Sequence, residues 1–309
     1  MTSRSAASTV RAINCGSSDP AVGDLQLNLK QMQSAKSSSV SKLTGGIETL
    51  FKMNKVDYIK GTASFQSPTK LDVALLDGGN TEVEAKNIII ATGSEISKFP
   101  GIDIDEKQVV SSTGALELDA VPGKFLVIGG GIIGLEMGSV WSRLGSEVTV
   151  VEYLGAIGGN GMDTEVAKQF QKILGKQGLK FKLQTKVLGL EKRDGKCFVK
   201  VEAAKGGKQE ELEADVVLVA IGRKPVTEGL NLEKVGIEVD EKGRVVVDSQ
   251  FNTSVGNVKC IGDVTFGPML AHKVRARIAT LADSAGRGGG HRGRRVPEGR
   301  ARACRASRT

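Results

Sequence analysis

The stretch from residue 125 to 152, FLVIGGGIIGLEMGSVWSRLGSEVTVVE, constrains the fold more than any other part of the chain. An apolar run leads into Gly129, Gly131 and Gly134 in the spacing G-x-G-x-x-G, and a helix-like pattern and a second apolar run follow. In such a unit the first glycine permits a tight turn, the second lets the backbone approach a ligand, and the third lets the helix pack against the strand. The sequence therefore predicts a strand–helix–strand unit of an α/β protein.

The helix start and the final acid indicate what this unit binds. A helix N-terminus presents free N–H groups and the positive end of its dipole, which attract phosphates. Glu152 ends the second strand roughly 20 residues beyond the glycines, where a carboxylate accepts hydrogen bonds from ribose hydroxyls and repels a 2′-phosphate. We therefore predict a dinucleotide site for NAD rather than NADP. A glycine turn with a purely structural role is the alternative.

Helical periodicity occurs in several segments. We predict a helix at residues 29–53 that is broken or strained at Gly45-Gly46, and a helix that starts at Pro268. Another is predicted to be capped by Asp163 or Thr164 and to end at Gly178. Between the glycines and Gly145, the face predicted to pack on the sheet consists of Ile133, Met137, Val140, Trp141 and Leu144.

Strand patterns fill much of the remaining chain. Residues 87–93 and 215–221 are continuous apolar runs, which predict strands buried on both faces. Further strands are predicted at residues 55–61, 64–67, 71–76, 81–85, 181–191, 197–203, 211–213, 244–248 and 258–263.

Composition narrows the possible classes of function. No apolar run reaches the roughly 20 residues that span a bilayer, so we expect a soluble protein with no membrane partner. Aromatic residues make up only 4% of the chain, which disfavours a stacking platform for single-stranded nucleic acid. The net charge of +8 comes from residues 274–309, with ten Arg, no Lys and two acids, because the rest of the chain is balanced.

The two ends differ in character from the segment between them. The abrupt Arg-rich composition after residue 273 is interpreted as an altered reading frame or a spliced-in end. An RNA-binding arginine tail is the alternative. Residues 1–23 are rich in Ser, Ala and Arg and are either an organelle-targeting leader or a disordered terminus.

The cysteines are widely separated, at Cys15, Cys197, Cys260 and Cys304. Because they form no C-x-x-C pair, we predict neither a metal site nor a redox disulfide from this spacing. Cys197 and Cys260 lie in strand-like runs and are expected to be small buried hydrophobic residues.

Four motifs occur in order along the chain. They are Ala91-Thr92-Gly93 at a strand end, the G-x-G-x-x-G unit, AIGRKP at residues 220–225 and IGDV at residues 261–264. Together they resemble the FAD- and NAD-dependent pyridine nucleotide-disulfide oxidoreductases. The segments GSVWSRLGSEVTVVE and IGDVTFGPMLAHK resemble the dihydrolipoyl dehydrogenases within that family. The resemblance covers residues 24–273, the central portion of such an enzyme.

The resemblance implies a Rossmann-like FAD/NAD(P)-binding α/β fold, with an NAD domain inserted in an incomplete FAD domain. We therefore expect a disordered or leader-like segment (1–23), a partial FAD-binding domain (24–123), an NAD-binding domain (124–242), an FAD-domain return segment (243–273) and a disordered Arg-rich tail (274–309).

Residue by residue, the resemblance implies two groups of cofactor contacts. The NAD-contacting positions are Gly129, Gly130, Gly131, Ile132, Ile133, Gly134, Leu135, Glu136, Glu152, Val187 and Gly222. The FAD-contacting positions are Gly61, Thr92, Gly93, Ser94, Asp263, Met269, Leu270, Ala271 and His272. Glu136 would lie near the nicotinamide, Asp263 would bond the ribitol chain, and the helix near Met269 would point its positive end at the flavin. A strand-end turn for Asp263 and a surface or capping role for His272 are the alternatives.

The implied activity is oxidation of dihydrolipoyl groups on lipoyl-bearing 2-oxo acid dehydrogenase complexes, with hydride passing through FAD to NAD. The family resemblance implies a mitochondrial homodimer, with a cytoplasmic location as the alternative. The redox disulfide, the first FAD glycine motif and the interface domain are not found in this sequence. We therefore assign no catalytic residue, give no role to His291, and expect the chain to be inactive alone. A non-catalytic NAD(H)-binding module and a basic-tail interaction protein are the alternative functions.

Overall fold

The computed structural model describes residues 26–159 and 161–274. These residues form two compact units. The first unit contains the described residues of the ranges Met1–Gly61 and Glu95–Lys224. The second unit contains those of the ranges Thr62–Ser94 and Pro225–Thr309. This division does not test the predicted domain boundaries, which stay predictions. The predictions for residues 1–23 and 275–309, including those for Cys15, His291 and Cys304, lie outside the described residues.

A parallel sheet of five strands forms the centre of the first unit, in the order β6-β13-β7-β8-β9. The strands are β6 (Val109–Val110), β7 (Lys124–Ile128), β8 (Glu147–Val151), β9 (Lys180–Lys182) and β13 (Val216–Val219). The apolar side chains of β7 and β13 are buried almost without exception, as expected of strands covered on both faces. The strand–helix–strand unit predicted at residues 125–152 is therefore confirmed.

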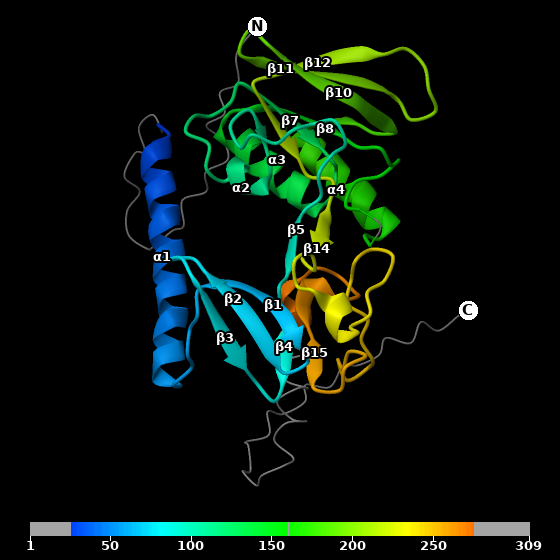
Figure 1. Ribbon diagram of the computed structural model, residues 1–309. Helices are drawn as coiled ribbons and strands as arrows, with labels where there is room; N and C mark the ends of the chain where they lie inside the picture. Colours follow the sequence, from blue (N-terminus) through cyan, green and yellow to red (C-terminus); the bar gives the residue numbers. More distant parts are fainter. Residues whose placement is uncertain (1–25, 160, 275–309) are drawn as a thin grey trace, which may run out of the picture. The chain divides into compact units, whose positions relative to one another are not determined.

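Three helices cover one face of this sheet (Figure 1): α2 (Ser112–Ala115), α3 (Ile132–Leu144) and α4 (Thr164–Lys176). Gly145 ends α3 in the left-handed conformation, as predicted. Asp163 caps α4 by accepting hydrogen bonds from the N–H groups of Glu165 and Val166, which confirms the predicted helix start.

The buried face of α3 differs from the predicted one. Val140 is exposed, whereas Leu135 and Gly138 are buried beside Trp141. A Cβ at Gly138 would lie 3.3 Å from Val148 Cγ1, so the missing side chain lets the helix lie close to the sheet. The periodicity rule counts only apolar side chains. It therefore left out Gly138 and predicted a buried face that is rotated around the helix from the observed one.

An antiparallel sheet covers the other face (Figure 1). It consists of β10 (Thr185–Arg193), β11 (Lys196–Ala203) and β12 (Glu210–Ala214), whose inward residues form a second core with β7, β8 and β13. The single strand predicted at residues 181–191 is wrong, because Gln184 has φ of +50° and divides it into β9 and β10. Such a turn at a non-glycine residue has no clear sequence signal.

Helix α1 (Leu29–Met53) belongs to the same unit and begins and ends where predicted. It is not broken at Gly45-Gly46, because glycine can take helical dihedrals at a cost of about 1 kcal/mol each. Gln33 donates to the Leu118 carbonyl oxygen at 3.1 Å, which holds the first turns of the helix. The strand predicted at residues 55–61 is wrong, because residues 56–60 are exposed and irregular. No helix within the described ranges is both long and apolar enough to cross a membrane.

The second unit contains two small sheets. Strands β1 (Gly61–Ser67), β2 (Lys70–Leu75) and β3 (Asn80–Glu84) form one, and β2 pairs with β3 in the antiparallel direction. Strands β4 (Ile88–Ile90) and β15 (Val258–Cys260) form a parallel pair. This unit also contains two short 3₁₀ helices, η2 (Leu232–Val235) and η3 (Gly262–Val264). Strands β5 (Ser94–Ile96) and β14 (Arg223–Pro225) pair where the chain passes between the units.

Two strand predictions in the second unit need correction: the strand predicted at residues 87–93 forms as β4 but is not buried on both faces, and the strand predicted at residues 244–248 does not form. Ile89 is 54% exposed, so β4 is not buried on both faces among the described residues. Residues 244–248 form no strand, because only Val245 makes isolated bridges, to Val239 and Thr265. Alternating side chains favour extended backbone there, but a strand also needs a continuous hydrogen-bonded neighbour.

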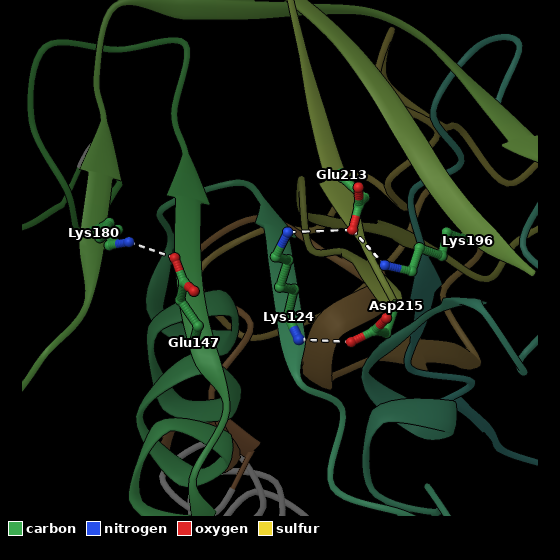
Figure 2. Close-up of polar contacts among 6 residues, drawn as sticks. All are labelled: Lys124, Glu147, Lys180, Lys196, Glu213 and Asp215. Atoms are coloured by element: carbon green, nitrogen blue, oxygen red, sulfur yellow. Dashed lines mark hydrogen bonds and ion pairs between the residues drawn. The ribbon is translucent and has the colours of Figure 1, made fainter.

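Ion pairs gather at the amino ends of the parallel strands (Figure 2). Glu213 accepts from Lys196 Nζ at 2.5 Å and from Lys124 Nζ at 3.2 Å, and Lys180 pairs with Glu147 across β8 and β9. The Lys124 backbone N–H donates to Asp215 at 2.7 Å. The Lys196 and Lys124 partners hold the pKa of Glu213 below its usual range, and Glu213 raises the pKa of Lys196.

Replacing Trp141 by Phe should lower stability. The buried indole N–H donates to the Ala115 carbonyl oxygen at 3.0 Å, and Phe would leave that carbonyl without its donor. We expect the free energy of unfolding to fall by about 1–3 kcal/mol, measured by urea denaturation followed by circular dichroism. The control Val140→Ala, at an exposed position of α3, should change it by less than about 1 kcal/mol. Equal effects would contradict the role given to this hydrogen bond.

Replacing Glu213 by Gln should give a pH-dependent loss of thermal stability. Folding lowers the pKa of Glu213, so its ionised carboxylate stabilises the folded state at any pH above the ordinary carboxyl pKa. This stabilisation is lost as the pH falls through the pKa of Glu213 in the folded protein. The raised pKa of Lys196 preserves the pair until strongly alkaline pH. The Tm difference from wild type should therefore be present near neutral pH, vanish in strong acid and shrink with added salt. A difference that persists in acid would exclude the ion pairs as its source, and Glu228→Gln is the control.

Candidate functional site

The glycine-rich turn lies at the carboxyl end of β7, next to the ends of β8 and β13. Gly129 has φ of +107°, and a Cβ there would lie 2.4 Å from the Ala220 carbonyl oxygen. A Cβ at Gly134 would lie 2.2 Å from the Gly129 carbonyl oxygen. Since neither distance is possible for real atoms, both positions require glycine, for the turn and for the close helix packing that the sequence predicted.

Gly131 differs from these two glycines because it borders open space. A Cβ there would meet no heavy atom within 4 Å. Gly131 is also the N-cap of α3, and no side chain caps this helix. The N-terminus of α3 therefore presents backbone N–H groups and its positive dipole end at an open position, which fits an anionic group such as a pyrophosphate.

Glu152 follows β8 and is partly buried beside the turn. Its Oε2 accepts the Gly130 N–H at 2.6 Å, and its Oε1 accepts the Leu154 N–H at 2.7 Å. A carboxylate has about four acceptor positions, so both oxygens keep capacity for ribose hydroxyls. The sequence placed this acid in the ribose position but missed its bonds to Gly130 and Leu154, because a backbone donor has no signature in the sequence.

The other predicted NAD contacts differ in exposure. Ile132 and Glu136 are exposed on α3, and Ile133 is partly exposed. The Leu135 side chain is buried in the core, so only its backbone could face a ligand. Val187 packs against the second core from β10, and Gly222, with φ of +128°, accepts the Ser97 N–H through its carbonyl oxygen.

In the second unit, the parallel pair β4–β15 brings predicted FAD contacts together. Ser94 Oγ donates to Asp263 Oδ2 at 2.9 Å, across 169 positions of sequence. Thr92 Oγ1 donates to the Val226 carbonyl oxygen at 2.6 Å, and Gly93 has φ of +74°. Thr92, Gly93, Ser94 and Asp263 thus lie at the carboxyl ends of adjacent parallel strands, where open α/β sheets bind ligands.

The remaining predicted FAD contacts are less closely grouped. Gly61 is an exposed residue at the start of β1. Met269 is partly exposed, and Leu270, Ala271 and His272 are exposed. The helix predicted to start at Pro268 begins at Ala271, because residues 268–270 form an irregular turn.

The described cysteines give no sign of redox or metal chemistry. Cys197 and Cys260 are buried, as predicted, and burial raises the pKa of the Cys197 thiol, which disfavours the reactive thiolate. Within residues 26–159 and 161–274, no group of three His, Cys, Asp or Glu could hold a metal ion.

Comparison with known proteins identifies the family. Residues 6–277 match the family model of the pyridine nucleotide-disulphide oxidoreductases, and the chain belongs to this family. It is 63% identical over 270 residues to a dihydrolipoamide dehydrogenase of Chaetomium thermophilum, covering 87% of this chain and 54% of that protein. It is 53% identical over 253 residues to the mitochondrial dihydrolipoyl dehydrogenase of Homo sapiens, covering 82% of this chain and 50% of the relative.

The fold agrees with this assignment. The Cu(II) complex of the HOCl-induced flavoprotein disulfide reductase RclA from Escherichia coli matches with a TM-score of 0.75 and 30% identity, covering 82% of this chain and 56% of RclA. The Rossmann-like α/β class and the resemblance to the central portion of a dihydrolipoyl dehydrogenase are thereby confirmed. The chain spans about half the length of the curated relatives that it matches.

Proposed function

We propose that the segment 124–242 binds NAD at the carboxyl edge of its parallel sheet. The observation that carries the proposal is the uncapped N-terminus of α3, with open space at Gly131 and the Glu152 carboxylate beside it. The backbone N–H groups of the turn would hold the pyrophosphate. Glu152 would accept hydrogen bonds from the ribose hydroxyls and repel a 2′-phosphate, which favours NAD over NADP.

The other predicted contacts complete this proposed site. Exposed Glu136 would lie toward the nicotinamide end, and Val187 and Gly222 would border the rest of the ligand. The bound nicotinamide ring would supply a hydride acceptor. The protein contributes binding and orientation through its backbone N–H groups and the Glu152 carboxylate.

We further propose that residues of the second unit contribute to an FAD site. The Ser94–Asp263 hydrogen bond supports this assignment, because it fixes a carboxylate at the carboxyl ends of two parallel strands. Asp263 would accept a hydrogen bond from the ribitol chain. Thr92, Gly93, Gly61 and residues 269–272 would supply further contacts. The site would be incomplete within this chain, because the sequence contains no G-x-G-x-x-G motif before Gly129 that could hold the FAD pyrophosphate.

For the whole enzyme to which such a segment belongs, we propose oxidation of dihydrolipoyl groups on 2-oxo acid dehydrogenase complexes, with electrons passing through FAD to NAD. The names of the relatives support this substrate, and the mitochondrial name of the human relative supports a mitochondrial location at the level of the family. The homodimer is proposed from the family resemblance alone. The given 309 residues contain no cysteine pair with four intervening residues, so we propose that they do not catalyse this reaction alone.

A non-catalytic NAD(H)-binding module is the second candidate, and the intact glycine turn favours it. The basic-tail alternative depends on residues 274–309, which lie almost entirely outside the described part of the chain.

The purified 309-residue protein tests both the NAD site and the proposed loss of catalysis. We expect NADH to bind, flavin absorbance to be weak or absent, and no NAD-linked oxidation of dihydrolipoamide to occur. The measurements are NADH fluorescence titration, the visible absorption spectrum and an NADH-production assay. A yellow protein with dihydrolipoamide turnover would refute the proposed loss of catalysis, and absence of NADH binding would refute the NAD site.

Replacing Glu152 by Ala should weaken NADH binding. A charged hydrogen-bond acceptor contributes about 1.5–3 kcal/mol, so the Kd should rise at least about tenfold. The preference for NADH over NADPH should also fall, because the carboxylate no longer repels the 2′-phosphate. Titration of both nucleotides measures the change, and Glu165→Ala, which removes an exposed acid from α4, is the control. Unchanged affinity for NADH would contradict the role of Glu152.

A further inference from the structure

The peptide groups on either side of Gly130 are fixed from two directions. Its N–H donates to Glu152 Oε2 at 2.6 Å. Its carbonyl oxygen accepts the Gly158 N–H at 2.7 Å. Glu152 and Gly158 both lie beyond β8, so the segment that follows this strand holds the glycine turn that follows β7.

This segment, residues 153–159, is itself anchored. Ile157 is 1% exposed and packs in the core that also contains Leu135 of α3, although residues 153–156 before it are exposed. Gly158 has φ of +90°, and a Cβ there would lie 2.4 Å from Met162 Sδ. A side chain at position 158 would therefore strain the backbone and displace Met162.

The Gly158 contact determines which way another amide points. The Gly130 carbonyl and the Gly131 N–H belong to one planar trans peptide, so they point in opposite directions. Since the carbonyl is held by Gly158, the Gly131 N–H is directed away from that segment. If this peptide rotated, a carbonyl oxygen would replace an N–H group at the anion position, which would repel a phosphate.

We propose that Gly158 and Ile157 are positioning residues of the dinucleotide site. Ile157 anchors the segment in the core, and Gly158 fixes the peptide between Gly130 and Gly131 so that its N–H is available to the pyrophosphate. This inference rests on the proposed NAD binding. Neither residue needs to touch the ligand, and neither belonged to the contacts that the sequence predicted.

The proposal separates two parts of the ligand. Glu152 serves the ribose side, whereas the peptide between Gly130 and Gly131 serves the pyrophosphate. Loss of the Gly158 contact should therefore weaken the binding of ADP, which has a pyrophosphate, more than the binding of AMP, which has one phosphate. A general loss of folded protein would reduce both apparent affinities by the same factor, so the ratio of the two Kd values is independent of it.

The test compares two neighbouring glycines in the full chain. Gly158→Ala and Gly159→Ala both place alanine at positive φ, but a Cβ at Gly159 would meet no atom within 4 Å. We expect Gly158→Ala to raise the Kd of NADH and to reduce the preference for ADP over AMP, each about tenfold. Gly159→Ala should keep that preference within about twofold of wild type. Calorimetric titrations supply the Kd values.

A second pair of variants covers the case in which Gly158→Ala does not fold. Ile157→Ala loosens the anchor and should reduce the preference for ADP over AMP, while Ile157→Val should largely restore it. The proposal is overturned if the ratio of the AMP and ADP Kd values is unchanged in Gly158→Ala, or in Ile157→Ala where only that variant folds. In that case, NADH binding by the wild-type protein would still support the proposed function. If wild type binds no NADH, both fail.

Discussion

The bond from the Gly130 N–H to the Glu152 carboxylate is the interaction on which the site depends. It joins the segments that follow β7 and β8, whose backbones are already paired along the sheet. It also places a negative side chain beside the positive end of α3. Without this bond the turn would lose one of its anchors, and without the carboxylate the proposed site would have no acceptor for the ribose hydroxyls. The two features act as a unit because one hydrogen bond connects them.

The packing behind the turn explains why that geometry can be maintained. Gly134 and Gly138 bring α3 close to β7 and β8, and Trp141 fills the space further along the helix. On the other face, the inward residues of β10, β11 and β12 cover the same strands. Packing on both faces therefore holds the parallel strands in place, and it also fixes the positions of the residues at their carboxyl ends.

Sequence reasoning succeeded where a local rule was sufficient. Asp163 before an apolar repeat predicted the start of α4, and three spaced glycines before a helix predicted the turn and its steric requirements. It failed where the outcome depends on distant neighbours. The exposure of Ile89 depends on what covers β4, and the division at Gln184 depends on which sheet each half joins. The burial of Ile157 inside a glycine-rich segment depends on the core beneath α3, so the anchor could not be recognised from its local pattern.

The two edges of the parallel sheet differ in how their charges are satisfied. At the amino edge, the carboxylates of Glu213 and Glu147 are paired with lysines, so that edge has its charges matched within the protein. At the carboxyl edge, no side chain caps the N–H groups of α3, and the two oxygens of the neighbouring Glu152 accept from Gly130 and Leu154. In the proposed site, the positive end of the helix would attract an external anion, and the carboxylate would favour a nucleotide with hydroxyls rather than a phosphate on its sugar. In the proposed NAD site, a preference for NAD over NADP would follow from this contrast within a single turn.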